Sequence, residues 1–159
     1  MQIKFLVEED FVNYKKPSMF IGFPTCDWKC EKSCGIKGIC QNSELANALT
    51  FNVSNDSICN RYIENPISKS LVIGGLEPFD NWVELDTLIQ EFRNHTDDDI
   101  VIYTGYYADE IIDKINHMRQ HYNNIIIKFG RFIPNQTSHH DEVLGVKLAS
   151  DNQYAERIC

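Results

Sequence analysis

Four of the six cysteines in this chain fall within one short segment, at Cys26, Cys30, Cys34 and Cys40. Thiolates grouped this closely are soft ligands, which suit Zn²⁺ or an iron–sulfur cluster. Four cysteines would complete a tetrahedral zinc site, whereas three would hold a [4Fe–4S] cluster and leave one iron open to a small molecule. The spacing alone does not decide between the two metals, so the choice depends on the rest of the chain.

A second segment that could do chemistry is Gly74-Gly75-Leu76-Glu77-Pro78, which follows a strand of the buried type. Paired glycines let a ligand approach the backbone closely, and the Glu77 carboxylate can accept a hydrogen bond from a ligand ammonium group. Taken by itself, the segment is more typical of a glycine turn beside a solvated acid. Its combination with the cysteines favours a cofactor site.

Short apolar runs alternate with amphipathic stretches, which predicts right-handed βαβ units and a parallel sheet. We expect one α/β domain over residues 1–159. The predicted strands are residues 19–23, 70–73, 99–103, 124–129 and 143–149, and the predicted helices are residues 44–49, 57–64, 82–92 and 111–118.

Four chemistry-bearing segments each follow a predicted strand: the cysteine segment, Gly74-Gly75, Thr104-Gly105 and Gly130-Arg131. In parallel α/β architectures, the carboxyl ends of the strands form the rim that carries the active site. We therefore expect these segments to converge on one pocket.

The spacing Cys26-x-x-x-Cys30 and the glycine–acid segment together resemble two motifs of the radical S-adenosylmethionine (SAM) enzymes. More narrowly, the chain resembles the small activating proteins of anaerobic ribonucleotide reductases. Its further matching segments are Cys40-Gln41-Asn42, Thr104-Gly105-Tyr106, Phe129-Gly130-Arg131-Phe132 and Ser150-Asp151-Asn152-Gln153, in that family's order. The chain departs from the family in two places. Three residues separate Cys30 from Cys34 and nine separate it from Cys40, where the family has two, and Leu76 is an extra residue.

The resemblance implies a shortened, open (β/α) barrel with a mainly parallel sheet and a [4Fe–4S] cluster at its rim. It implies that one electron cleaves bound SAM to methionine and a 5′-deoxyadenosyl radical, so the cofactor bears the radical and no side chain is catalytic. The implied partners are a glycyl-radical enzyme, an anaerobic ribonucleotide reductase, and an electron donor such as flavodoxin or ferredoxin. The residues implied to contact SAM are Gly74, Gly75, Glu77, Thr104, Asn152 and Ile39.

The third cluster ligand is either Cys34 or Cys40. Cys34 is nearer to the family's spacing, but Cys40 has the family's context, because Ile39 before it can pack against the adenine. Cys40 also precedes a predicted helix, whose N-terminal N–H groups favour a thiolate. We therefore predict that Cys26, Cys30 and Cys40 are the ligands and that Cys34 is a spare thiol.

Composition narrows the remaining functions. A formal net charge of -8 disfavours a nucleic-acid partner, because phosphate backbones are repelled. No apolar run is long enough to span a bilayer, and the N-terminus lacks a signal-peptide pattern, so we expect a cytoplasmic protein with no membrane partner. Two alternatives stay open: a zinc-stabilised interaction module that uses all four clustered cysteines and has no catalysis, and a radical SAM relative that acts on another substrate.

Histidines and one further cysteine offer weaker candidates. His117 and His121 lie four residues apart on one predicted helix, a spacing that can bind a metal. No third ligand is evident near them in the sequence, so we interpret them as helix surface. We expect His139 and His140 in a solvated polar loop, and Cys59 as a small core residue.

Overall fold

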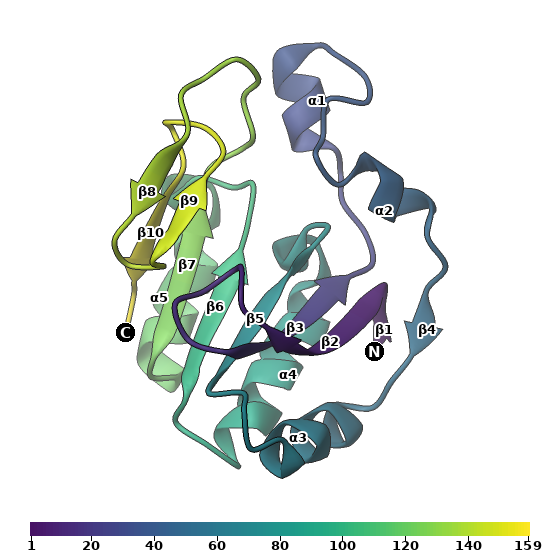
Figure 1. The fold of residues 1–159 in the computed structure, drawn as a ribbon, viewed down its shortest axis with the longest axis vertical. Helices are drawn as coiled ribbons and strands as arrows, with labels where there is room; N and C mark the ends of the chain where they lie inside the picture. Colours follow the sequence, from purple (N-terminus) through teal and green to yellow (C-terminus); the bar gives the residue numbers. More distant parts are fainter.

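The computed structural model describes residues 1–159 and contains one central six-stranded sheet (Figure 1). The inner strands pair in parallel, whereas the two outer strands each pair antiparallel with their neighbour. The sheet is therefore mixed, and the carboxyl ends of its four parallel strands meet at one edge. In spatial order the strands are β10 (Tyr154–Arg157), β7 (Ile125–Phe129), β6 (Asp99–Tyr103), β5 (Ser70–Gly75), β3 (Ser18–Phe23) and β2 (Phe5–Asp10).

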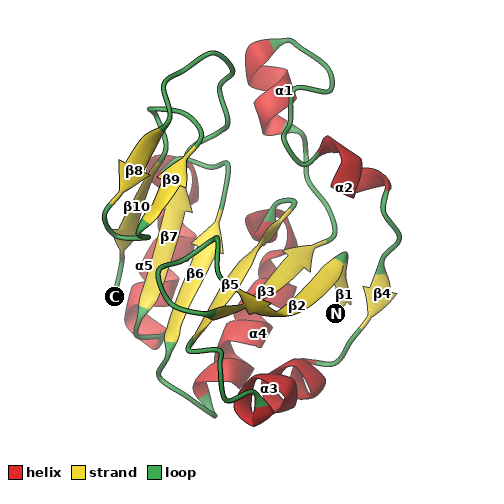
Figure 2. Cartoon of the chain, viewed as in Figure 1, coloured by secondary structure: helices red, strands yellow, loops and turns green.

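Three helices cover one face of the sheet: α3 (Asn55–Glu64), α4 (Trp82–Arg93) and α5 (Ile112–His121) (Figures 1 and 2). Each is amphipathic, and the buried stripe of α4 repeats every three or four residues, as a helix that packs on a core requires. That stripe consists of Leu85, Leu88, Ile89 and Phe92, all 0% exposed. It belongs to the larger of two hydrophobic clusters, which also contains Cys59 as predicted.

The opposite face of the sheet is covered by the segment before β3 and by a hairpin of β8 (His139–Asp141) and β9 (Val146–Leu148). Val72, Val101 and Ile126 project into this second cluster, where they meet Tyr14 and Leu148. The inner strands are thus buried on both faces, which explains why they appear in the sequence as continuous apolar runs.

The remaining elements are short helices, 3₁₀ turns and one two-stranded pair. The connection after β3 forms two short helices, α1 (Lys29–Cys34) and α2 (Ser43–Asn47), and α1 stands above the carboxyl rim (Figure 1). This connection then forms β4 (Phe51–Asn52), which pairs with β1 (Gln2–Ile3). Short 3₁₀ turns, η1 (Pro78–Asn81) and η2 (Ala108–Ile111), follow β5 and β6. None of these helices is long and apolar enough to cross a membrane.

Asp99, at the start of β6, connects several segments at the end of the sheet that lies away from the carboxyl rim. Its carboxylate accepts hydrogen bonds from Tyr14 at 3.0 Å, from Arg157 at 2.7 Å and from Lys16 at 2.5 Å. Burial alone would raise the pKa of Asp99, but these hydrogen bonds outweigh burial and lower the pKa below its usual value. The buried carboxylate is therefore ionised and fully partnered.

The α/β class and every inner strand are confirmed, and so are the crossover helices. The sequence did not reveal the antiparallel edge strands, and the closure of a shortened barrel stays a prediction. Two local expectations were wrong. The strand predicted over residues 143–149 is only β9, because residues before it form the hairpin turn, and His139 and His140 lie on β8 instead of in a polar loop.

Candidate metal centre

A cavity of about 370 Å³ lies at the carboxyl ends of the parallel strands. All four segments expected at the rim contribute to it, together with residues of α2, β9 and the C-terminal segment. Thirteen of its 24 lining residues are hydrophobic, a count that includes the three cysteines, so apolar and polar groups share the wall. The lining residues that could act chemically are Cys26, Cys30, Cys40, Asn42, Gly75, Glu77, Thr104, Gly105, Lys128, Gly130 and Gln153.

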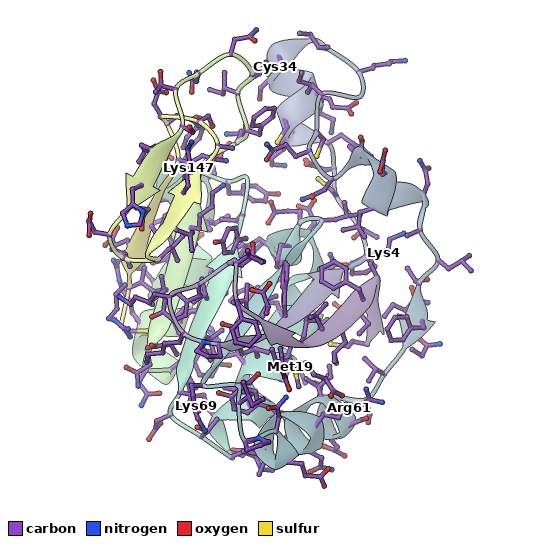
Figure 3. The ribbon with its side chains drawn as sticks, viewed as in Figure 1. Lys4, Met19, Cys34, Arg61, Lys69 and Lys147 are labelled. Atoms are coloured by element: carbon purple, nitrogen blue, oxygen red, sulfur yellow. The ribbon has the colours of Figure 1, made fainter.

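Three of the four clustered cysteines line this cavity: Cys26, Cys30 and Cys40. Cys34 does not line it; it is the last residue of α1, where Figure 3 shows it above the rim. Trp28, two residues after Cys26, adopts a left-handed conformation with φ 63° at the start of α1, which carries Cys30. The placement agrees with the ligand set predicted from the sequence, and the identity of the third ligand stays a prediction.

Cys30 and Cys40 interact directly through their thiols. The hydrogen bond between them lowers the pKa of Cys30 to about 6 and raises that of Cys40. The Phe132 backbone N–H and the positive charge of Lys128 also favour the Cys30 thiolate. A thiolate is the form of cysteine that binds a metal, so Cys30 is poised for ligation.

Cys26 has a different environment. Burial, together with the nearby carboxylates of Glu77, Asp80 and Asp27, raises the pKa of its thiol to about 11. Ligand atoms of Cys26, Asp27 and Asp80 all lie within 4.8 Å of one another. Cys26 is therefore a neutral thiol in the free protein and must lose its proton to bind a metal.

The cysteine segment is fastened to the sheet through Asp80 of η1. The Asp80 carboxylate accepts from the Asp27 backbone N–H at 2.8 Å and from the Tyr106 hydroxyl at 2.5 Å. The Lys29 ammonium lies over the Tyr106 ring, 4.3 Å from its centroid. Tyr106 follows β6, so these contacts join the start of α1 to the ends of two strands.

Glu77 is 5% exposed, and its carboxylate is held by protein donors. Oε1 accepts from the Thr104 hydroxyl at 2.7 Å and from the Phe79 backbone N–H at 3.1 Å, while Oε2 accepts from the Gly105 backbone N–H at 2.9 Å. Burial raises the pKa of Glu77 to about 7 despite these hydrogen bonds. Glu77 therefore joins the ends of β5 and β6. It also lines the cavity, and its contact with SAM stays a prediction.

The two glycines before Glu77 have different environments. Gly75 has φ +82°, and a Cβ atom there would lie 2.7 Å from the Gly22 Cα of the neighbouring strand. Its carbonyl accepts from the Asn42 side chain at 2.6 Å, which joins the segment after Cys40 to the end of β5. Gly74 does not line the cavity, and a Cβ there would lie 3.2 Å from the Phe20 ring.

Lys128, on β7, brings a buried positive charge to the cavity. It is 7% exposed, and its ammonium donates to the Gly130 carbonyl at 2.9 Å. Burial lowers the pKa of Lys128 to about 8, while the charges of Cys30 and Glu77 oppose this shift. Sequence reasoning missed Lys128, although a single lysine within the apolar strand Ile125–Phe129 was the available signal.

Besides Gly74, two further predicted contact residues, Asn152 and Ile39, are not among those that line the cavity. Ile39 is half-buried beside Cys40. The Asn152 amide donates to the Tyr107 hydroxyl at 3.1 Å and to the Arg131 carbonyl at 2.9 Å. Its Oδ1 is buried without a hydrogen-bond partner, as is the Arg131 Nε. Buried polar atoms are normally satisfied, so this acceptor and this donor suit a further bound group.

Fold and cavity together define an α/β protein with a soft-metal site at the carboxyl rim of its sheet. A family model described as 4Fe-4S single cluster domain matches residues 18–154, which is most of the chain. The chain therefore belongs to the 4Fe-4S single cluster domain family. Comparisons with curated proteins and with solved structures find no match.

Family membership and the donor set agree on the cofactor. Three thiols at one cavity, one of them predisposed to ionise, suit the sulfur ligation of a [4Fe–4S] cluster. The nearby Lys128 ammonium compensates part of the negative charge that three thiolates bring. The protein is thus a [4Fe–4S] cluster protein, and its domain is compatible with a redox enzyme.

Proposed function

We propose that this protein is a radical SAM enzyme of the glycyl-radical activating type. The observation that carries the proposal is the meeting of the needed groups at one cavity: three cysteines, the glycine–acid segment and the end of β6. When bound, the cluster would pass one electron from a donor protein to SAM, and the chemistry supplied would be cleavage to methionine and a 5′-deoxyadenosyl radical able to take hydrogen from a substrate glycine. The protein's own groups bind and orient these cofactors and exclude water.

Cys26, Cys30 and Cys40 are proposed to hold the cluster, which leaves one iron for the amino and carboxylate groups of SAM. Gly105 leaves room beside them, because a Cβ at this position would lie 3.8 Å from the Cys30 Sγ and 3.6 Å from the Glu77 Oε2. Glu77 is proposed to act as a positioning residue that holds Thr104 and Gly105 at the site. Lys128 supplies a positive charge that suits a ligand carboxylate.

The proposed partner is a larger glycyl-radical enzyme, of the anaerobic ribonucleotide reductase class, with flavodoxin or ferredoxin as the electron donor. Family resemblance supports this assignment, and so does the exposure of part of the cavity wall. Its wall includes Val12, which is 74% exposed, and the β9 residue Lys147, which is also exposed. A cavity walled partly by such exposed residues suits a loop of a partner protein better than a small molecule that must be enclosed.

Anaerobic reconstitution tests the proposal. We expect about four irons per chain and broad absorbance in the visible range, and release of 5′-deoxyadenosine once SAM and a strong reductant are added. A mixture with the reductase should then give the doublet of a glycyl radical in electron paramagnetic resonance. A colourless protein that holds one zinc would favour the interaction module. A complete cluster that never cleaves SAM would contradict the proposed activity.

A further inference from the structure

The surface between α4 and α5 carries a group of metal-ligating side chains well separated in sequence from the cysteine segment. Sequence spacing suggested His117 and His121 as a ligand pair that lacked a third member. The fold supplies that member, because Asp86 of α4 lies against α5 with its Oδ1 3.1 Å from the His117 Nε2. A cavity of about 320 Å³ is lined by all three residues.

We propose that Asp86, His117 and His121 form a binding site for a Zn²⁺-class transition-metal ion. Imidazole nitrogen and carboxylate oxygen are the ligands that such ions prefer after thiolate. Zinc–ligand bonds of about 2.0–2.1 Å in a tetrahedral arrangement place two ligand atoms ~3.3 Å apart. The separation of His117 Nε2 and Asp86 Oδ1 is close to that distance, so one ion can bridge them with little movement.

The hydrogen bonds around the site indicate where the imidazole protons lie. His117 Nε2 faces the Asp86 carboxylate, which can only accept, so a metal must displace the proton on this nitrogen when it binds. His121 Nδ1 lies 2.8 Å from the His117 carbonyl oxygen, which can only accept, so Nδ1 carries the proton and Nε2 carries the lone pair. A histidine that donates its other N–H to a carbonyl is a recurrent feature of metal sites. The Tyr122 hydroxyl donates to the same Asp86 Oδ1 at 2.8 Å and so helps to fix the carboxylate.

The rings are already arranged side by side. The imidazoles of His117 and His121 stack with centroids 4.3 Å apart and planes 25° apart, and Trp82 packs against His117 edge to face at 5.6 Å. The three ligand atoms are not as tightly grouped as those of Cys26, Asp27 and Asp80. The exposed His121 ring therefore has to turn about its side-chain bonds to complete the site.

The charge balance also favours a cation. Asp86 has no lysine or arginine partner, and its one ion-pairing neighbour is His117. Arg93, which also lines this cavity, donates instead to the carbonyls of Asn123 at 2.8 Å and Asp98 at 2.9 Å. The carboxylate is thus left without a fixed positive charge, and both it and His117 remain partly exposed, at 28% and 39%.

The test uses Zn²⁺ alone as the probe and a readout that is resolved by residue. Diethylpyrocarbonate modifies accessible neutral histidines, and peptide mass spectrometry measures the rate at each one. We expect Zn²⁺ to slow modification of His117 and His121 together, while His95 and His140 serve as internal controls. Zinc bound at the cysteines does not change this readout, so the result is independent of the proposed radical chemistry.

Two variants keep the proposal falsifiable. Asp86→Asn retains the size of the side chain and should raise the Zn²⁺ concentration for half-protection of His117 by about tenfold or more. His121→Ala alters only an exposed position and should have a similar effect at His117. The proposal is overturned if Zn²⁺ protects neither histidine in the unaltered protein. It is equally overturned if protection of His117 is the same in both variants as in the unaltered protein.

Discussion

Replacing Gly75 by alanine should destabilise the protein through two separate effects. At φ +82° an alanine adopts the left-handed region, which costs ~1–2 kcal/mol. Its Cβ would also lie 2.7 Å from the Gly22 Cα, 3.0 Å from the Gly22 carbonyl carbon and 3.0 Å from the Phe23 nitrogen. All three atoms belong to backbone that is paired in the sheet, so we add ~1–3 kcal/mol for overpacking. A gain of ~0.4–1 kcal/mol from the less flexible unfolded chain offsets part of these costs, so the expected loss in the free energy of unfolding is ~1–5 kcal/mol.

Gly35→Ala is the matched control. Gly35 has φ +68°, but a Cβ there would meet no atom within 4 Å. Both alanine variants share the left-handed cost and the gain of ~0.4–1 kcal/mol from a less flexible unfolded chain. The difference between the two losses in unfolding free energy therefore measures the cost of the close approach between Gly75 and the Gly22 backbone.

Urea denaturation of the metal-free proteins, followed by far-ultraviolet circular dichroism, measures both values. Gly74→Ala provides an intermediate case, because its Cβ would lie 3.2 Å from a Phe20 ring atom that can move. We expect Gly75→Ala to lower the free energy of unfolding more than Gly74→Ala does, and Gly35→Ala to lower it by ~1 kcal/mol. Equal losses for Gly75→Ala and Gly35→Ala would refute the argument that strand packing requires this glycine.

Three further predictions concern the site and its support. Cys40→Ser should lose the cluster while Cys34→Ser keeps about four irons after reconstitution, and the reverse result would identify Cys34 as the third ligand. Asn42→Ala removes the hydrogen bond to the Gly75 carbonyl and should hasten iron loss to a chelator, whereas an unchanged rate would show that this contact does not support the site. Asp99→Asn should cost ~1–3 kcal/mol at neutral pH. Since hydrogen bonds lower the pKa of Asp99, that difference should shrink as pH falls below 3.8 and through the folded-state pKa, and a constant difference would contradict the assigned ion pairs.

The inner part of the fold was predictable because burial on both faces leaves a strong mark on sequence. Strands β5, β6 and β7 are apolar over most of their length, and each ends at or close to a glycine. The edge strands were missed for the opposite reason. β2 reads Phe-Leu-Val-Glu-Glu-Asp and β10 reads Tyr-Ala-Glu-Arg, so charges that suit an exposed edge conceal the strand pattern.

The cavity was predictable only in part. Strand ends indicated which segments would meet, but they could not show which side chains would turn inward. Glu77 illustrates this. Two of its three hydrogen-bond donors, Thr104 and Gly105, lie 27 and 28 positions further along the chain, so the motif itself does not reveal them. The third donor is the nearby Phe79 backbone N–H. The Asp86 carboxylate beside His117 is similar, since the two lie 31 positions apart in the chain and only helix packing brings them together.

The hydrogen bond between Cys30 and Cys40 has a consequence for metal uptake. Between the pKa of Cys30, about 6, and that of Cys26, about 11, only one of the three proposed ligands is already ionised. Three ligands less one thiolate leaves two protons that must be released as the cluster binds. The apparent affinity should then rise about a hundredfold for each unit of pH. Within this pH range, acidification should therefore weaken metal binding at these thiols.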